Sequence, residues 1–301
     1  MRNAQGPDAE TAGSVSPADQ RVVVLLRGWA PFVGILIAYE VMRDLASAFG
    51  VRPYDLEWFD TTVFDGYQPT LVLQAAVARL TDADLIDDIG SIVYATHFLL
   101  PVAVAAWLWM RDRHGFRRFG LTLVILCALA FVTYVVAPTT PPWLAQPTSV
   151  RHLIEDTIQR SGLPENLVWL YSHHDYNLYA AFPSLHAGFP VVAAFAAWQR
   201  SRGIGLLLAA WAIVVWVSVV YLGEHYVADA IAGIAFAIAS FYAVEFAFRR
   251  LAKPGEADPG LGLVEPVDGQ EDGGVALEIP RQAEGPNRHP AGAEVPAQLH
   301  D

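Results

Sequence analysis

Apolar residues gather into six long runs, separated by segments rich in charged residues, glycine and proline. The runs cover approximately these residues: 22–42, 90–110, 119–137, 183–199, 204–222 and 230–248. Most of them approach the length of about 20 residues that a helix needs to cross the hydrocarbon layer of a bilayer. Backbone N–H and C=O groups in lipid must be paired within their own segment, which favours helices. The pattern therefore predicts an all-α polytopic membrane protein, a six-transmembrane-helix bundle.

Two longer connections, residues 50–89 and 144–180, interrupt this series. Within the first, Pro69 is expected to begin a short helix that ends near Leu80 and is too short to span. Acidic and aromatic side chains alternate before it, a mixture typical of the membrane–water interface. We therefore expect an interfacial helical segment here, carrying these aromatic residues: Trp58, Phe59, Phe64 and Tyr67.

Four aspartates precede the second apolar run: Asp82, Asp84, Asp87 and Asp88. Clustered carboxylates could suggest a metal site. They lack the glycine turn and the bidentate glutamate of a calcium loop, and negative charge is favourable at a helix N-terminus. We therefore interpret the cluster as the solvated start of a helix.

Composition agrees with a membrane protein, since 54% of the residues are hydrophobic and only 17% are charged. The net charge of −12 is concentrated at the ends, because residues 254–301 hold ten acidic and two basic residues. The central part has no basic surface for nucleic acid. We expect a disordered lead-in at residues 1–20, a membrane domain at 21–253 and a disordered acidic tail at 254–301.

The distribution of basic residues predicts the orientation in the membrane. With six spans, eleven arginines and lysines fall on the side that holds both termini, and five fall on the other. The positive-inside rule then places both termini in the cytoplasm, at the plasma membrane if the protein is bacterial. The first 20 residues lack the apolar segment of a secretory signal, so insertion is expected to depend on internal spans.

Two short motifs lie at the ends of apolar runs and carry the candidate chemistry. Residues 181–188 contain His186, and residues 221–229 contain His225 and Asp229. Residues four apart share a helix face, so Asp229 can reach the ring of His225. A carboxylate there fixes the tautomer and makes the other ring nitrogen a better base or nucleophile. The pair of histidines therefore indicates acid–base or nucleophilic chemistry on a lipid-borne substrate.

Each motif also has an ordinary explanation. His186 alone could be an interfacial histidine, and the His225–Asp229 pair alone could be a structural hydrogen bond. Their coincidence with Pro183 and Ser184, on the face predicted to lie outside the cytoplasm, favours an active site. His97, within the second run, is either a core histidine or a functional group.

Phe182-Pro183-Ser184-Leu185-His186, followed by His225 and Asp229, resembles the type 2 phosphatidic acid phosphatase superfamily over about residues 90–248. The resemblance implies a phosphohistidine mechanism on a lipid phosphate or phospholipid substrate. His225 would attack the phosphorus, Asp229 would hold its ring, and His186 would act as general acid and base. Ser184 and the backbone N–H groups after Pro183 would bind phosphate oxygens, as helix N-termini do. No metal or other cofactor is then expected.

Two further segments, Pro138–Trp143 and Tyr221–Tyr226, look most similar to the inositol-phosphorylceramide-synthase branch of that superfamily. This similarity implies transfer of a phospho-headgroup to an alcohol acceptor such as inositol, with Trp143 near the substrate. Hydrolysis of a lipid phosphate needs only water and is the simpler reaction. Both remain open, as does a non-catalytic membrane scaffold or transporter that keeps the fold.

The chain departs from the superfamily pattern in its basic residues. The usual pattern has an arginine six residues before the nucleophile, where this chain has Val219, and Trp143 is not followed by a basic residue. Other side chains must then neutralise the phosphate. The candidates are Arg151, which we prefer, and Arg160, His173 and His174. A zinc site formed by His173, His174, Asp175 and His186 is a less favoured alternative, because adjacent histidines point in different directions.

Overall fold

In the computed structural model of the chain, the described residues are 28–30, 33–34, 37–38, 41, 53–166, 168–169 and 178–251. All of them belong to one compact unit, Met1–Leu261, whereas Gly262–Asp301 forms a second unit that is not described. Most of the first predicted span lies outside the described residues. So do both predicted domain boundaries, at residues 20 and 253.

Helices account for the regular structure of the described residues, and the predicted all-α class is confirmed. Thr139 adds only isolated parallel bridges to Tyr54 and Ala180. The helices are α2 (Glu57–Val63), α3 (Pro69–Val77), α4 (Ala83–Arg111), α5 (Arg113–Val136), α6 (Pro142–Ala145), α7 (Leu153–Arg160), α9 (Leu185–Trp198), α10 (Arg202–Tyr221) and α11 (Val227–Leu251).

Three of the described helices, α5, α10 and α11, are long and apolar enough to cross a membrane. A fourth candidate is α4, which is bent by 46° between Ala83–His97 and Leu99–Arg111. Pro101 lies just after the break and removes the N–H that would bond to the carbonyl of His97, which accounts for the bend. The integral membrane character is therefore supported, with three or four spans among the described residues.

Polar side chains at the predicted turns begin the long helices. Asp112 accepts a hydrogen bond from the N–H of Gly115 at the start of α5, at 2.8 Å. Ser184 accepts one from Ala187 at the start of α9, at 3.2 Å. Such caps replace the partners that the first N–H groups of a helix lack. The start of α9, which carries His186, is thereby fixed.

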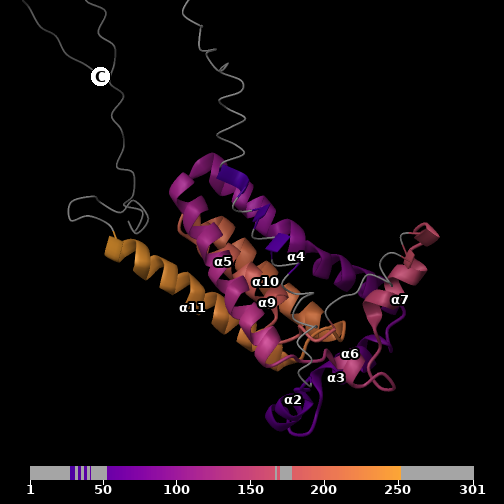
Figure 1. Cartoon of the computed structure of the whole chain (residues 1–301). Coiled ribbons are helices and arrows are strands. Elements are labelled where there is room, and N and C mark those ends of the chain that lie inside the picture. Colours follow the sequence, from indigo (N-terminus) through magenta and orange to yellow (C-terminus); the bar gives the residue numbers. More distant parts are fainter. Residues whose placement is uncertain are drawn as a thin grey trace, which may run out of the picture. The chain divides into compact units, whose positions relative to one another are not determined.

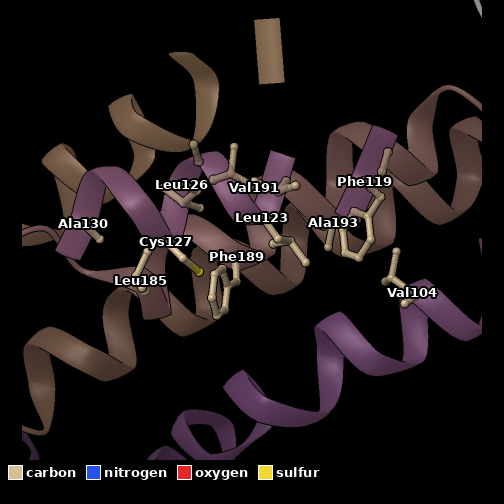
Figure 2. Close-up of a cluster of buried hydrophobic side chains, with 14 of the residues drawn as sticks. Val104, Phe119, Leu123, Leu126, Cys127, Ala130, Leu185, Phe189, Val191 and Ala193 are labelled. Atoms are coloured by element: carbon tan, nitrogen blue, oxygen red, sulfur yellow. The ribbon is translucent and has the colours of Figure 1, made fainter. Parts of the chain in front are cut away.

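Helix α9 forms the centre of the bundle and packs against α4, α5, α10 and α11. Figure 2 shows its Leu185, Phe189, Val191 and Ala193 among buried side chains of α5, with Cys127 in the same cluster. Cys127 is buried in this cluster, at 2% exposure, where it packs as a small hydrophobic side chain. Because this core holds the helix from all sides, its first turn is a rigid support for a functional group.

Glycines allow α9 and α11 to approach closely. A Cβ atom at Gly233 would overlap the carbonyl oxygen of Ser184, and one at Gly188 would lie 3.0 Å from the carbonyl oxygen of Gly233. Gly233 therefore permits close packing of the two helices. The contact joins the two helices that bear the sequence motifs.

The short helices α2, α3, α6 and α7 lie toward one end of the long helices (Figure 1). Helix α7 packs on α4, α3 on α10, and α2 on α11. Gln74 of α3 ties several of these elements together. Its Nε2 donates to the carbonyl oxygens of Arg151 and Tyr221, each at 3.0 Å, and its Oε1 accepts from the N–H of Arg151 at 3.0 Å.

The aspartate cluster before the second run is not simply a solvated helix start, which corrects that interpretation. Helix α4 begins at Ala83, and Asp87 is only 1% exposed. Asp87 accepts a hydrogen bond from the hydroxyl of Tyr221 and lies 3.7 Å from both Arg151 and Arg160. The buried carboxylate thus joins α4 to α7 and α10.

Candidate active site

The two motif histidines meet at the end of the bundle where the short helices lie. His186 stands in the first turn of α9, and His225 stands in the turn between α10 and α11. His225 Nε2 lies 3.3 Å from His186 Nδ1, and both residues line one cavity of about 740 Å³. The structure therefore brings the two predicted histidines within reach of a single substrate atom.

Asp229 supports His225 from the first turn of α11. It is fully buried, and its Oδ2 lies 3.5 Å from His225 Nδ1. The same oxygen accepts a hydrogen bond from the N–H of Tyr226 at 2.8 Å. Because His225 precedes the helix, Asp229 reaches back to it from the N-terminal turn rather than along a helix face. The other ring nitrogen of His225, Nε2, therefore faces His186.

Ser184 and Pro183 take part in the site through the backbone. Ser184 is fully buried, its hydroxyl caps α9, and its N–H donates to the carbonyl oxygen of Asp229 at 3.0 Å. The carbonyl oxygen of Pro183 accepts from the hydroxyl of Tyr134 at 3.0 Å. Neither residue is among the described residues that line the cavity. Ser184 thus joins the two motifs and Pro183 ties the first motif to α5, while phosphate binding by Ser184 remains a prediction.

Trp143 lines the cavity and is anchored beside the nucleophile turn, because its backbone N–H donates to the carbonyl oxygen of Gly223 at 3.1 Å. Its indole stacks on His152, with ring centroids 4.0 Å apart and planes at 6°. His152 Nε2 in turn lies 3.1 Å from Glu224 Oε1. His152 and Glu224 also line the cavity, although the sequence motifs did not single them out.

The candidate phosphate-binding cations occupy different places. Arg151 is held by Asp156 at 2.8 Å and is not among the described cavity-lining residues, whereas Arg160 does line the cavity. Arg160 also approaches Asp88 at 3.3 Å. His173 and His174 lie outside the described residues. The geometry thus favours Arg160 over our first choice, Arg151.

Aromatic rings surround His186. Tyr94 stacks on it with centroids 4.0 Å apart, and His97 lies at the same centroid distance. His97 is 3% exposed, stacks also on Phe189 and lines the cavity. His97 is therefore both a core histidine and a neighbour of the candidate acid–base group. In the sequence, its position inside an apolar run was the only indication that His97 could be functional.

Asp60 of α2 is a buried carboxylate that the motifs did not predict. It is fully buried, and its two oxygens accept hydrogen bonds from the N–H groups of Val227 at 3.0 Å and Ala228 at 3.3 Å. Burial raises the pKa of Asp60 above the ordinary 3.8; the two N–H groups oppose this rise, and the charge of Asp229 adds to it. Asp60 therefore caps the helix that carries Asp229.

A family profile described as the PAP2 superfamily matches residues 69–243. The chain is 25% identical over 260 residues to a protein of Bacteroides thetaiotaomicron named phosphoinositol dihydroceramide synthase, an alignment that covers 78% of this chain and 80% of that protein. No solved structure matches the chain.

Proposed function

The chain belongs to the PAP2 superfamily, and on that premise we propose that it works through a phosphohistidine formed on His225. It is a lipid phosphatase or phosphotransferase. The observation that carries the mechanism is the approach of His225 Nε2 to His186 Nδ1, at 3.3 Å, with a fully buried Asp229 behind the first ring. Nucleophile, orienting acid and second imidazole then have the arrangement that covalent catalysis requires.

In the first step, the phosphoryl group of a lipid binds in the cavity that both imidazoles line. His225 Nε2 attacks phosphorus, the P–O bond to the leaving alcohol breaks, and His186 gives its proton to the leaving oxygen. Asp229 stabilises the positive charge on the ring of His225 through Nδ1. The first residues of α9 and Arg160 line the same cavity, and in this proposal they offset the charge of the phosphoryl oxygens.

In the second step, an acceptor hydroxyl attacks the same phosphorus. His186 removes the proton of the acceptor, the P–N bond breaks, and His225 is free again. Water as acceptor gives a phosphatase, and an alcohol gives a phosphotransferase. The relative named phosphoinositol dihydroceramide synthase supports transfer, with inositol as the candidate alcohol or headgroup.

The placement in the membrane forms part of the proposal. We take the six-helix topology, with the cavity facing away from the cytoplasm and both termini inside, as the arrangement in which the enzyme acts. The larger number of basic residues on the side of the termini supports it. A lipid can then enter from the outer leaflet.

Trapping the phosphoenzyme tests the mechanism. Purified protein in detergent is mixed with a lipid phosphate labelled at phosphorus and quenched in base, in which phosphohistidine survives. We expect label on the wild type and none on His225→Ala. His114→Ala is the matched control, because His114 is an exposed histidine of α5, and it should keep the label.

Label on His225→Ala would disprove the nucleophile assignment. Turnover without any trapped label, unaffected by His225→Ala, would point to direct transfer. Complete absence of His225-dependent turnover with every donor tested would favour the scaffold or transporter.

A further inference from the structure

A second imidazole–carboxylate pair lies in the same cavity as the nucleophile. It consists of His152 at the start of α7 and Glu224, which is the residue before His225. His152 Nε2 and Glu224 Oε1 are 3.1 Å apart, and both side chains stay partly exposed, at 28% and 14%. The mechanism proposed above uses neither of them.

The surrounding structure holds this pair in place. Trp143 covers one face of the His152 ring at a centroid distance of 4.0 Å, and its backbone N–H donates to the carbonyl oxygen of Gly223. Gln74 fixes the backbone of Arg151, directly before His152. The positions of the three cavity-lining side chains are therefore fixed by α3, α6 and the nucleophile turn. Such pre-organised polar groups are typical of a specificity site.

The hydrogen-bonding groups of the pair indicate which ligand fits. The carboxylate of Glu224 offers two acceptor oxygens, and its negative charge repels a second phosphate. The ring nitrogens of His152 can donate or accept hydrogen bonds. Hydroxyl groups suit both side chains, because each can donate to an oxygen or nitrogen and also accept. A flat indole beside them offers an apolar surface for the ring carbons of a cyclic polyol.

We propose that Trp143, His152 and Glu224 form a subsite for an uncharged polyhydroxylated group, of the cyclitol or sugar class, held next to the phosphorus. The proposal rests on the function proposed above and adds its specificity. The group could be the headgroup that the donor lipid carries or a free acceptor from solution. Both present the same hydroxyls to the same three side chains.

Kinetics of Glu224→Gln distinguish the two sources. In the donor arm, phosphatidylinositol and phosphatidic acid are compared in mixed micelles, and the ratio of their kcat/KM values is measured. In the acceptor arm, phosphatidic acid is the donor, and the KM for added myo-inositol is measured from the phosphomonoester product, inositol phosphate. Loss of a hydrogen bond to a charged group predicts a change of about 10- to 100-fold in one arm.

A change in the donor ratio assigns the subsite to the headgroup, and a change in the inositol KM assigns it to a free acceptor. Glu155→Gln is the matched control, since Glu155 is on α7 but is not among the described cavity-lining residues, and it should match wild type in both arms. Wild-type values in both arms for Glu224→Gln would overturn the proposal.

Binding provides a readout that does not depend on turnover. Calorimetry with inositol 1-phosphate, glycerol phosphate and ethanolamine phosphate on His225→Ala should rank inositol 1-phosphate first. Adding Glu224→Gln should remove that preference. An unchanged preference would overturn the subsite even if the phosphohistidine is confirmed, and a preference without His225-dependent turnover would refute only the proposed function. Unchanged thermal midpoints establish that each variant is folded.

Discussion

Asp60 closes the first turn of α11, two residues after the histidine that we assign as the nucleophile. Its partners, Val227 and Ala228, are 167 and 168 residues away in the sequence. Exposed aromatic residues flank it, with Trp58 63% and Phe64 40% exposed, so α2 buries its carboxylate and exposes its rings. This reverses the usual amphipathic arrangement of a soluble helix, and it agrees with the prediction that the segment lies at the interface.

Removing this cap should destabilise the protein measurably. Asp60→Ala leaves two N–H groups of α11 without their acceptor, which costs about 1–2 kcal/mol for the loss of a helix N-cap. We expect a lower free energy of unfolding in mixed micelles. Thr62→Ala, at an exposed position of the same helix, should change it far less. Equal stability of Asp60→Ala and wild type would show that solvent replaces the carboxylate.

The titration of Asp60 gives a pH dependence with a definite sign. Its pKa is raised above the ordinary 3.8, chiefly by burial. A carboxyl of this kind contributes stability that is fully present below the unfolded pKa and is lost as the pH rises through the folded pKa. Asp60→Asn cannot titrate. Unfolding measured across this range should therefore show wild type losing stability relative to Asp60→Asn as pH rises, and a constant difference would contradict this.

At this scale, the sequence was informative only where partners are close along the chain. Spacing alone placed Asp229 near His225, and the structure brings these two and His186 together. Asp60 and Gln74 were missed because their hydrogen-bond partners lie in distant segments, and a polar residue in an interfacial stretch gives no signal of burial. Glu224 was missed although it is next to His225, because its partner His152 comes from the other connection.

Helices α9 and α11 approach closely where Gly233 meets the first motif. A Cβ at Gly233 would overlap backbone atoms of Ser184, which cannot move aside as a flexible side chain can. The start of α9 also donates to the carbonyl oxygen of Asp229. The spacing of the two helices therefore sets the spacing of the two histidines.

Gly233→Ala should separate these helices and reduce both stability and activity. Overpacking of a tight contact costs about 1–3 kcal/mol, and a small shift of His186 relative to His225 can lower kcat about 100-fold. Gly120→Ala is the matched control in α5, because nothing lies within 4 Å of a Cβ there. It should retain activity and be slightly more stable, as expected for alanine in a helix. Full activity of Gly233→Ala would show that the helices can adjust.

Apolar runs predicted the helices well but not all of their ends. Helices α5, α10 and α11 contain nearly all of the predicted third, fifth and sixth spans. Helix α4 begins seven residues before its predicted run, at Ala83, because Asp87 is buried and both Asp87 and Asp88 pair with Arg160 of α7. Such long-range charge pairing does not appear in a hydrophobic pattern.

For the whole molecule, the number and direction of the spans are the main untested predictions. Cys127 is the only cysteine and is 2% exposed, so it can be replaced by alanine to give a cysteine-free background. His114 in α5 and Gln159 in α7 are exposed positions on opposite predicted sides. They provide one reporter for each side of the membrane.

In intact cells, a membrane-impermeant maleimide should label Gln159→Cys and leave His114→Cys unlabelled until the membrane is opened. The physical reason is the group of arginines near His114 at the start of α5, which should keep this end of the helix in the cytoplasm. The reverse pattern would invert the proposed orientation. Labelling of both in intact cells would contradict an odd number of spans between the two positions.

The bridges of Thr139 to Tyr54 and Ala180 connect three segments through main-chain atoms. Thr140 N–H donates to the carbonyl of Tyr54 at 3.0 Å, Thr139 N–H to Tyr179 at 2.8 Å, and Ala181 N–H to Thr139 at 3.2 Å. Because no side chain is needed for these bonds, relatives could replace most residues here and retain the same backbone connection between the three segments. Inserting or deleting one residue in any of the three segments would instead shift its backbone donors and acceptors out of register with the other two. Among relatives, the side chains of these three segments should therefore vary widely, whereas the lengths of the segments should stay constant.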